Sequence, residues 1–307
     1  MPRVIVVLAT FNGAAFLHEQ LASLAVQERL PDALLIADDG STDGTQALVR
    51  DWAAGAPFPV EILPATEIRR GPAGNFSRLL EAAQMTSPDW VLPCDQDDVW
   101  HPTKIARCLA AVSGVDAGGP RLVVHDLVVS DRDLRQTAAS FWHHQAFSPI
   151  HGSRFTTLLL MNSFPGCAMM ASRGLLRIAL PIPPEAVMHD WWLAAVAAAT
   201  GVIDIIAEPL GFYRQHGRNT VGVHPPGFWS RVRAKLFADP VRPQAAICQA
   251  RALRRVVGGR VSGVSHRALS LVAGFFRLGS GRRLALLRAG VRKTGFLRAI
   301  HALMNLR

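Results

Sequence analysis

The stretch that decides the fold is VIVVLAT, residues 4–10, followed by Phe11-Asn12-Gly13. A continuous run rich in β-branched residues is typical of a parallel strand that is buried on both faces. The Asn-Gly pair ends this strand, and apolar residues then recur at helical spacing from Phe16 to Ala25. The chain is therefore predicted to begin with a strand followed by a helix.

The same alternation continues along the first third of the chain. It predicts strands at 34–37, 60–63 and 90–93, and helices around 47–52, from about 74 to 85, and from near 102. Repeated βα units indicate an α/β fold, a Rossmann-like mostly parallel sheet flanked by helices on both faces. Beyond Arg121 the pattern is less regular, with strands expected at 122–129 and 202–206 and a helix opening at 188–193.

Polar residues gather where three of these strands end. They are Thr10 and Asn12, then Asp38-Asp39, then Asp95-Gln96-Asp97-Asp98. Ligands of such sheets bind at the carboxyl ends of the strands. Asp95 and Asp97 are hard oxygen ligands suited to Mg²⁺ or Mn²⁺; the alternative is a solvated acidic turn in which Asp98 caps the next helix.

Asp38 and Asp39 can accept hydrogen bonds from a nucleotide base or ribose, with Thr10 and Asn12 on the same ligand. The alternative is an Asx turn with a helix cap and a closed Asn-Gly turn. The stretch from Gly71 to Phe76 precedes a helix, so its N–H groups and the Asn75 amide can face an anion. Gly and Pro can equally serve only as turn residues here.

Two later residues are candidates for chemistry. Asp190, in His189-Asp-Trp-Trp192, lies between aromatic residues, which can raise its pKa toward that of a general base. Its alternative role is a helix N-cap in a packed core. His216, in Arg214-Gln-His-Gly217, can bind a metal or a phosphate, or can be structural.

Composition limits the class of protein. The six apolar residues of 4–9 are short for a signal-peptide core and lack a cleavage site, which predicts a cytoplasmic protein. The weakly polar stretch 191–203 is too short for a membrane span of about 20 residues. Cysteines at 94, 108, 167 and 248 have no CxxC or metal-finger spacing, and are expected to be small buried side chains.

Charge divides the chain in two. Residues 228–307 hold 17 of the 33 Lys and Arg but one of the 23 Asp and Glu, whereas the rest is net acidic. With the Pro-Pro-Gly break at 225–227, this predicts a domain at 1–225 and a basic amphipathic helical tail at 226–307.

Taken together, the motifs resemble those of the family 2 inverting glycosyltransferases with the GT-A fold, in wording closest to the rhamnosyltransferase-like subgroup. The resemblance spans roughly residues 3–222. It rests on VVLATFNG, LLIADDGSTDGT, GPAGNF, PCDQDDVW, SFPGCAMM, HDWW and YRQHGRN, in this order.

This resemblance implies a role for each candidate residue. Asp190 matches the base that deprotonates the acceptor hydroxyl, and His216 a histidine that reaches metal or diphosphate. Asp97 becomes the metal ligand, with Mg²⁺ or Mn²⁺ as cofactor. The nucleotide-sugar pocket is then formed by Thr10, Asn12, Asp38, Asp39, Asn75 and Asp95. Two departures are Asp98, which leaves open which aspartate touches metal, and His189, where many relatives have a second acid.

The resemblance also implies a UDP-, GDP- or dTDP-sugar donor and a glycan or lipid-linked acceptor in cell-surface, O-antigen-like polysaccharide synthesis. Basic residues of the tail alternate with apolar anchors, as in helices that lie on anionic membranes. We therefore expect a peripheral protein at the inner face of the cytoplasmic membrane, rather than nucleic-acid binding. The proposed anchors are Phe228, Trp229, Val232, Leu236, Phe237, Leu284, Leu286, Leu287, Val291, Phe296, Leu297 and Ile300.

Other functions remain as alternatives. Asp95-x-Asp97 after an apolar strand also fits the nucleophile motif of haloacid-dehalogenase-type phosphatases, but the chain has only three lysines and no obvious later acidic pair. No GxGxxG follows the first strand, which disfavours a dinucleotide dehydrogenase. A non-catalytic module that binds sugar nucleotides or membranes is the alternative outside the enzymes.

Overall fold

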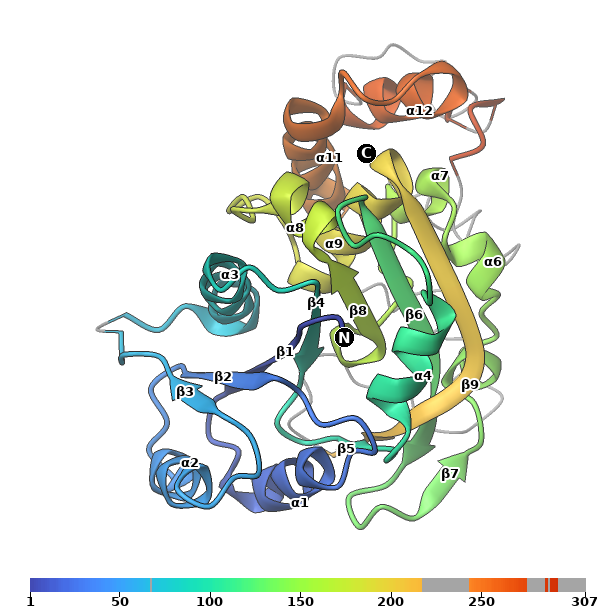
Figure 1. Ribbon diagram of the computed structural model, residues 1–307. Helices are drawn as coiled ribbons and strands as arrows, with labels where there is room; N and C mark the ends of the chain where they lie inside the picture. The colour runs from blue at the N-terminus through green and yellow to red at the C-terminus, as the bar shows by residue number, and fades with distance from the viewer. Residues whose placement is uncertain (67, 217–242, 275–284, 287, 292–307) are drawn as a thin grey trace.

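The computed structural model describes residues 1–66, 68–216, 243–274, 285–286 and 288–291. Figure 1 shows one curled sheet with helices packed against it. The strands are β1 (Val4–Thr10), β2 (Ala33–Asp38), β3 (Val60–Ile62), β4 (Trp90–Cys94), β5 (Val99–Trp100), β6 (Arg121–Ser130), β7 (Gln136–Ala138), β8 (Met169–Ser172) and β9 (Val202–Arg214). The helices are α1 (Ala14–Ala25), α2 (Thr45–Ala53), α3 (Gly71–Met85), α4 (Lys104–Ala111), α5 (Phe141–His144), α6 (Pro149–Gly152), α7 (Phe155–Leu158), η1 (Gly166–Ala168), α8 (Arg173–Ala179), α9 (His189–Thr200), α11 (Pro243–Val257) and α12 (Gly263–Ala273).

The strand order is β3-β2-β1-β4-β8-β6-β9-β5, and β7 pairs with β6. The first four strands are parallel, as the βα repeats predict. β8 then inserts antiparallel between β4 and β6, and β6 runs parallel to β9. The register places Thr10 opposite Asp38 and Leu8 opposite Cys94, so the carboxyl ends of β1, β2 and β4 lie together.

Alternate residues of β1 enter two separate cores. Val4, Val6 and Leu8 pack on the face covered by α1, α2 and α4. Ile5 and Val7 pack on the face covered by α3, α8 and α9. Both faces of the strand are therefore buried, which explains why it has no polar residue before Thr10.

Two elements differ from the sequence prediction. Helix α3 begins at Gly71 rather than near Gly74, because Pro72 is tolerated in its first turn. Strand β9 has 13 residues rather than five. Its interior Pro209 and Gly211 are accommodated by register shifts against β6, and its far end curves to pair with β5 (Figure 1).

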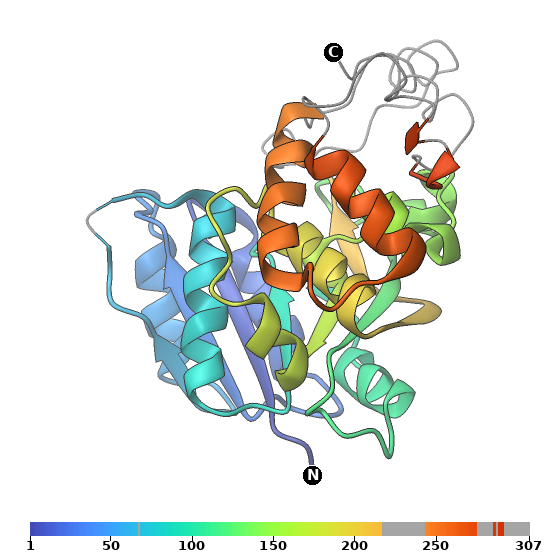
Figure 2. The same ribbon diagram turned by 90° about the horizontal axis from the view of Figure 1, so that it is seen from above.

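Part of the basic segment belongs to the core. Figure 2 shows α11 and α12 packed side by side. Helix α11 contacts α9 and helix α12 contacts α7, and the apolar residues of both helices join the core formed by α9. Leu286 and Val291 are 1% and 0% exposed, so their assignment as membrane anchors is wrong. The other proposed anchors lie outside the described residues, and the domain boundary at 225/226 stays a prediction. Among the described helices, none is long and apolar enough to cross a membrane.

Candidate functional site

The ends of β1 and β2 are joined by a hydrogen-bond network centred on Asp38. Thr10 Oγ1 donates to Asp38 Oδ2 at 2.8 Å, and the N–H groups of Gly40 and Ser41 donate to Oδ1 at 3.1 and 2.7 Å. Asn12 has a left-handed φ of 47° and accepts the Thr42 N–H at 2.9 Å. The structure thus brings Thr10, Asn12 and Asp38 together, and Asp38 makes the Asx turn that was its alternative role.

Asp39 provides the anion at the start of α3. Its carboxylate accepts the N–H groups of Arg70 at 2.7 Å and Gly71 at 2.8 Å, and lies 3.6 Å from Arg69 Nε. The sequence indicates that these N–H groups face an anion, and in the structure that anion is the protein's own side chain. Asn75 is buried and donates to Ala37 O at 2.8 Å, a bond that ties α3 to β2. The nucleotide-binding roles of Asp39 and Asn75 stay predictions.

Gln96 joins the acidic stretch to β1. Its amide accepts from Phe11 N at 2.8 Å and donates to Phe11 O at 2.9 Å. A Cβ on Gly13 would lie 2.1 Å from Gln96 Oε1, so a side chain at position 13 would break this pairing. The sequence motifs do not single out Gln96, although its place between two acids is a signal that it fixes their loop.

The acidic stretch itself splits in two. Asp97 Oδ2 lies 2.8 Å from His216 Nε2 at the end of β9. The imidazole stacks on Phe16 of α1, with ring centroids 4.5 Å apart. Arg214 donates to Asp97 O at 2.8 Å, and its guanidinium packs over the Phe16 ring, 4.9 Å from the ring centroid. Asp97 and His216 are thus adjacent, as their assignment to one metal requires.

Asp98 points the other way, into the protein. It is 2% exposed and accepts the Arg214 N–H at 3.1 Å, whereas α4 begins at Lys104 with Thr103 as its N-cap. The expectation that Asp98 caps this helix is therefore wrong. Burial, followed by the charge of Asp97, raises the pKa of Asp98 to about 7. Burial and the charges of Asp98, Asp97 and Asp190 raise the pKa of Asp95 well above its ordinary value.

Lys104 lies behind these carboxylates. It is fully buried, its ammonium donates to Cys167 O at 2.5 Å, and it sits 3.6 Å from the centre of the Trp100 ring. Burial lowers its pKa, while Asp98 is among the groups that raise it. The negative charge of Asp95, Asp97 and Asp98 is thus partly offset by the buried ammonium of Lys104. No sequence motif predicts this role for Lys104, although its being one of only three lysines in the chain is a weak signal.

Asp190 occupies the first turn of α9, after the N-cap Met188. It is 6% exposed, and burial raises its pKa to about 6, against hydrogen bonds from the Asn162 side chain and from the N–H groups of Trp191 and Gly166. Its proximity to the acidic loop follows from its effect on the pKa of Asp95. Asp190 is therefore a carboxylate that can take up a proton near neutral pH beside the predicted donor pocket.

His189 supports this turn as a neutral ring. It stacks on Phe76 with centroids 3.8 Å apart, and burial lowers its pKa to about 3. A Cβ on Gly166 would lie 2.5 Å from His189 Nε2, so glycine permits this packing. Where a second acid is expected, the chain thus has an uncharged side chain, and Asp190 is the ionisable group of the pair.

Known proteins resemble this chain in sequence and in fold. The pattern described as Glycosyl transferase family 2 matches residues 5–177. The dTDP-rhamnosyl transferase RfbG of Shigella flexneri is 27% identical over 225 residues, which cover 71% of this chain and 74% of that protein.

Two solved structures share the fold. The mannosyltransferase PcManGT from Pyrobaculum calidifontis, in complex with GDP-Man and Mn²⁺, superimposes with a TM-score of 0.54 at 19% identity, covering 99% of this chain and 86% of that one. S. aureus TarS 1-349, in complex with UDP-GlcNAc, superimposes with a TM-score of 0.53 at 16% identity, covering 94% of this chain and 79% of that one. The predicted GT-A fold is confirmed, and the match over more than half of the sequence decides against the phosphatase: the chain belongs to glycosyl transferase family 2.

Proposed function

We propose that this chain transfers a sugar, with inversion, from a nucleotide-sugar donor to a hydroxyl group of a glycan or lipid-linked acceptor in cell-surface polysaccharide synthesis. The observation that carries the proposal is Asp190, a buried carboxylate with a pKa of about 6 beside the acidic loop. A base of this pKa can deprotonate an alcohol as it attacks. Similarity to RfbG supports dTDP-rhamnose as the first donor to test.

In the proposed reaction the acceptor hydroxyl gives its proton to the Asp190 carboxylate as its oxygen bonds to the anomeric carbon. The bond from that carbon to the diphosphate oxygen breaks, and the nucleoside diphosphate leaves from the opposite face. Thr10, Asn12, Asp38, Asp39 and Asn75 would form or support the nucleotide pocket. Asp95 would contact the donor at its reacting end.

A divalent metal fits the residues present. The carboxylate of Asp97 and the imidazole of His216 are oxygen and nitrogen donors that Mn²⁺ or Mg²⁺ accepts, and they lie 2.8 Å apart. When bound, the ion would offset the charge of the departing diphosphate. The Mn²⁺ complex of PcManGT supports the same cofactor class.

The test is transfer by the full-length chain. UDP-, GDP- and dTDP-sugars are first screened for metal-dependent thermal stabilisation, since a ligand at 100 times its dissociation constant adds about 2.7 kcal/mol to stability. The best donor is then offered with lipid-linked acceptors. We expect Asp190→Asn to keep donor binding and lose transfer. If Asp190→Asn transferred as well as the wild type, the chain would be a binding module or would use another base.

We further propose that the chain works as a peripheral protein at the inner face of the cytoplasmic membrane, held there by basic residues of 228–307. The composition of this segment supports the proposal. Vesicles containing anionic lipid should retain the wild type and release a variant in which Arg231, Arg233 and Lys235 are replaced by Glu. The matched control replaces the exposed Arg50, Arg135 and Arg177; equal retention of both variants would contradict a membrane role for this basic cluster.

A further inference from the structure

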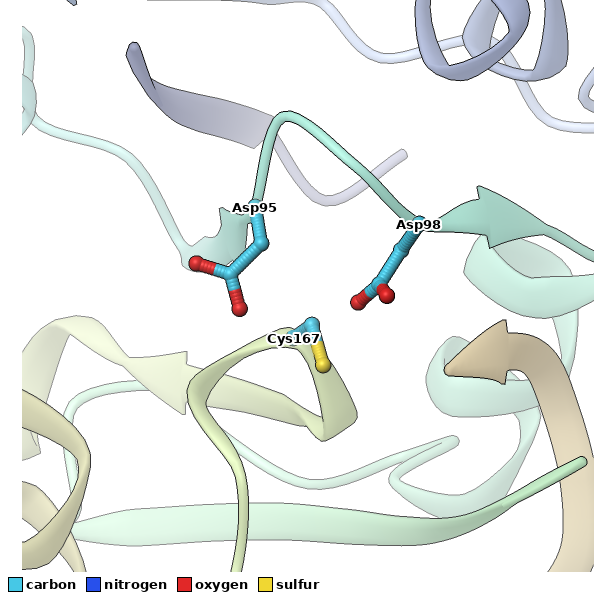
Figure 3. A group of neighbouring side chains, drawn as sticks. All are labelled: Asp95, Asp98 and Cys167. Atoms are coloured by element: carbon cyan, nitrogen blue, oxygen red, sulfur yellow. The ribbon is translucent and has the colours of Figure 1, made fainter. Parts of the chain in front are cut away.

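Three side chains from two separate segments converge beneath the end of β4. Asp95 follows β4 directly, Asp98 precedes β5, and Cys167 lies in η1. One oxygen of each carboxylate and the Cys167 sulfur all lie within 4.8 Å of one another. Figure 3 shows the Asp95 and Asp98 side chains extending from their loop toward Cys167. The arrangement offers one sulfur and two oxygen ligands to a single point.

One of these ligand atoms is poorly satisfied. Asp98 is 2% exposed and its Oδ1 accepts the Arg214 N–H, but no N–H or O–H group of the described residues donates to its buried Oδ2. The weak S–H donor of Cys167 is the side chain that hydrogen-bonds this carboxyl group. Leaving a buried polar atom unsatisfied costs about 1–3 kcal/mol, and more where the group is charged. A cation bound between Asp98, Asp95 and Cys167 would remove this cost.

The charge of the site matches a divalent cation. Two carboxylates and a thiolate carry three negative charges, and the buried ammonium of Lys104, bonded to the carbonyl of Cys167, contributes one positive charge. A divalent ion makes the sum zero. Burying charges is tolerated only when they are compensated in this way.

The ligand set differs in kind from the pair formed by Asp97 and His216. Asp97 contacts His216, and neither residue belongs to the group of three formed by Asp95, Asp98 and Cys167. Mg²⁺ is bound through oxygen, whereas a thiolate with carboxylates suits borderline cations such as Zn²⁺, at about 2.3 Å for sulfur and 2.0–2.2 Å for oxygen.

We propose that Asp95, Asp98 and Cys167 form a binding site for a thiophilic divalent cation of the Zn²⁺ class, separate from the Asp97 and His216 pair. On binding, the Cys167 thiol releases its proton to solvent as the sulfur–metal bond forms. Metal binding and spectroscopy test this site without the proposed transfer reaction. The site uses one oxygen of each carboxylate, so the second oxygen of Asp95 stays available to the donor.

The experiment uses Cd²⁺ as a probe on the full-length, metal-free chain. A sulfur-bound Cd²⁺ gives an ultraviolet charge-transfer band, and we expect this band to saturate at one ion per chain and to be abolished by Zn²⁺ but not by equimolar Mg²⁺. Cys167→Ser should remove the band. Cys248→Ser, at the half-buried cysteine of α11, and Asp97→Asn should retain it.

A second variant guards against a folding defect in Cys167→Ser. Asp98→Asn keeps the side-chain volume and the thiol, and should weaken Cd²⁺ binding at least tenfold while its thermal unfolding stays cooperative. The proposal is overturned if the wild type shows no band, if the band survives in Cys167→Ser or disappears in Cys248→Ser, or if Asp98→Asn binds Cd²⁺ as tightly as the wild type.

Discussion

Asp97 Oδ2 and His216 Nε2 lie 2.8 Å apart although 119 positions separate them in the sequence. The contact joins the loop after β4 to the end of β9, the strand that curves round to pair with β5. Phe16 completes it from α1, because its ring stacks on the imidazole. Three elements therefore position one oxygen–nitrogen pair at the edge of the sheet.

This relationship predicts the effect of removing the imidazole. His216→Ala should weaken Mn²⁺ binding by at least about tenfold to a hundredfold, because the loss of a group that only supports a metal ligand already has an effect of this size. Isothermal titration of the full-length chain with Mn²⁺ measures the change. His151→Ala, at an exposed histidine of α6, is the control and should leave the affinity unchanged; equal affinities for both variants would remove His216 from the metal site.

Asp190 predicts the pH dependence of transfer. A base with a pKa of about 6 is protonated in acid, so kcat/KM should fall about tenfold for each pH unit below 6 and level off above it. A pH profile with saturating metal measures this. A profile that stays flat down to pH 5 would show that Asp190 does not act as the base.

The same residue makes a prediction about stability. Folding raises the pKa of Asp190 from 3.8 to about 6. The contribution of Asp190 to the free energy of unfolding is therefore most favourable below pH 3.8, where its carboxyl group is neutral in both states, and this advantage is lost as pH rises through 6. The full difference corresponds to about 3 kcal/mol at about 1.36 kcal/mol per pKa unit. The free energy of unfolding of Asp190→Asn, measured relative to the wild type, should therefore be higher at pH 8 than at pH 4 by up to this amount. Urea unfolding at both pH values measures it; a variant that loses stability more at pH 8 would contradict the assigned cost of the buried charge.

Much of the sheet edge follows from the sequence. The parallel strands β1, β2 and β4 are local βα repeats, so the adjacency of Thr10 and Asp38 could be predicted from the pattern. The pairing of Asp39 with Arg70 and Gly71 could not, because it depends on how the loop before α3 folds back onto β2.

The interior of the site was harder to predict. Cys167 resembles any small buried side chain, and its contact with Asp98 arises because β8 inserts antiparallel beside β4. Strand β9 contains Pro209 and Gly211, which interrupt its apolar pattern and conceal its length. The position of His216 opposite Asp97 depends on that length, and local periodicity does not encode it.

Gly13 provides a test of how the loops are joined. Gly13→Ala would place a Cβ 2.1 Å from Gln96 Oε1, so the bonds between Gln96 and Phe11 must break, and we expect a loss of about 1–3 kcal/mol in unfolding free energy. Gly55→Ala is the matched control, since its Cβ would meet nothing within 4 Å. Combining Gly13→Ala with Gln96→Ala should cost less than the sum of the two changes. Strict additivity would mean that the two residues do not interact.

The buried position of Lys104 predicts that the stability of a Lys104 variant depends on pH. Lys104→Met removes a buried ammonium whose charge acts on Asp98. The cost of breaking a direct buried ion pair, about 3–5 kcal/mol, is the upper limit for the loss of stability. Asp98 has a pKa of about 7, so its carboxylate requires this ammonium at pH 8.5 but is neutral at pH 5.5. The loss of stability should therefore be larger at pH 8.5, where the variant buries the Asp98 carboxylate without this compensating charge, than at pH 5.5, where Asp98 is neutral.

The control for Lys104 lies on the same helix. Arg107 is 54% exposed and pairs with Glu208 at 2.7 Å, and an exposed pair of this kind contributes about 0–1 kcal/mol. Arg107→Met should therefore change the unfolding free energy little at either pH. If Lys104→Met lost the same stability at pH 5.5 and pH 8.5, Lys104 would act through its bond to Cys167 O and its packing on Trp100, because only compensation of the Asp98 charge makes the loss follow the ionisation of Asp98.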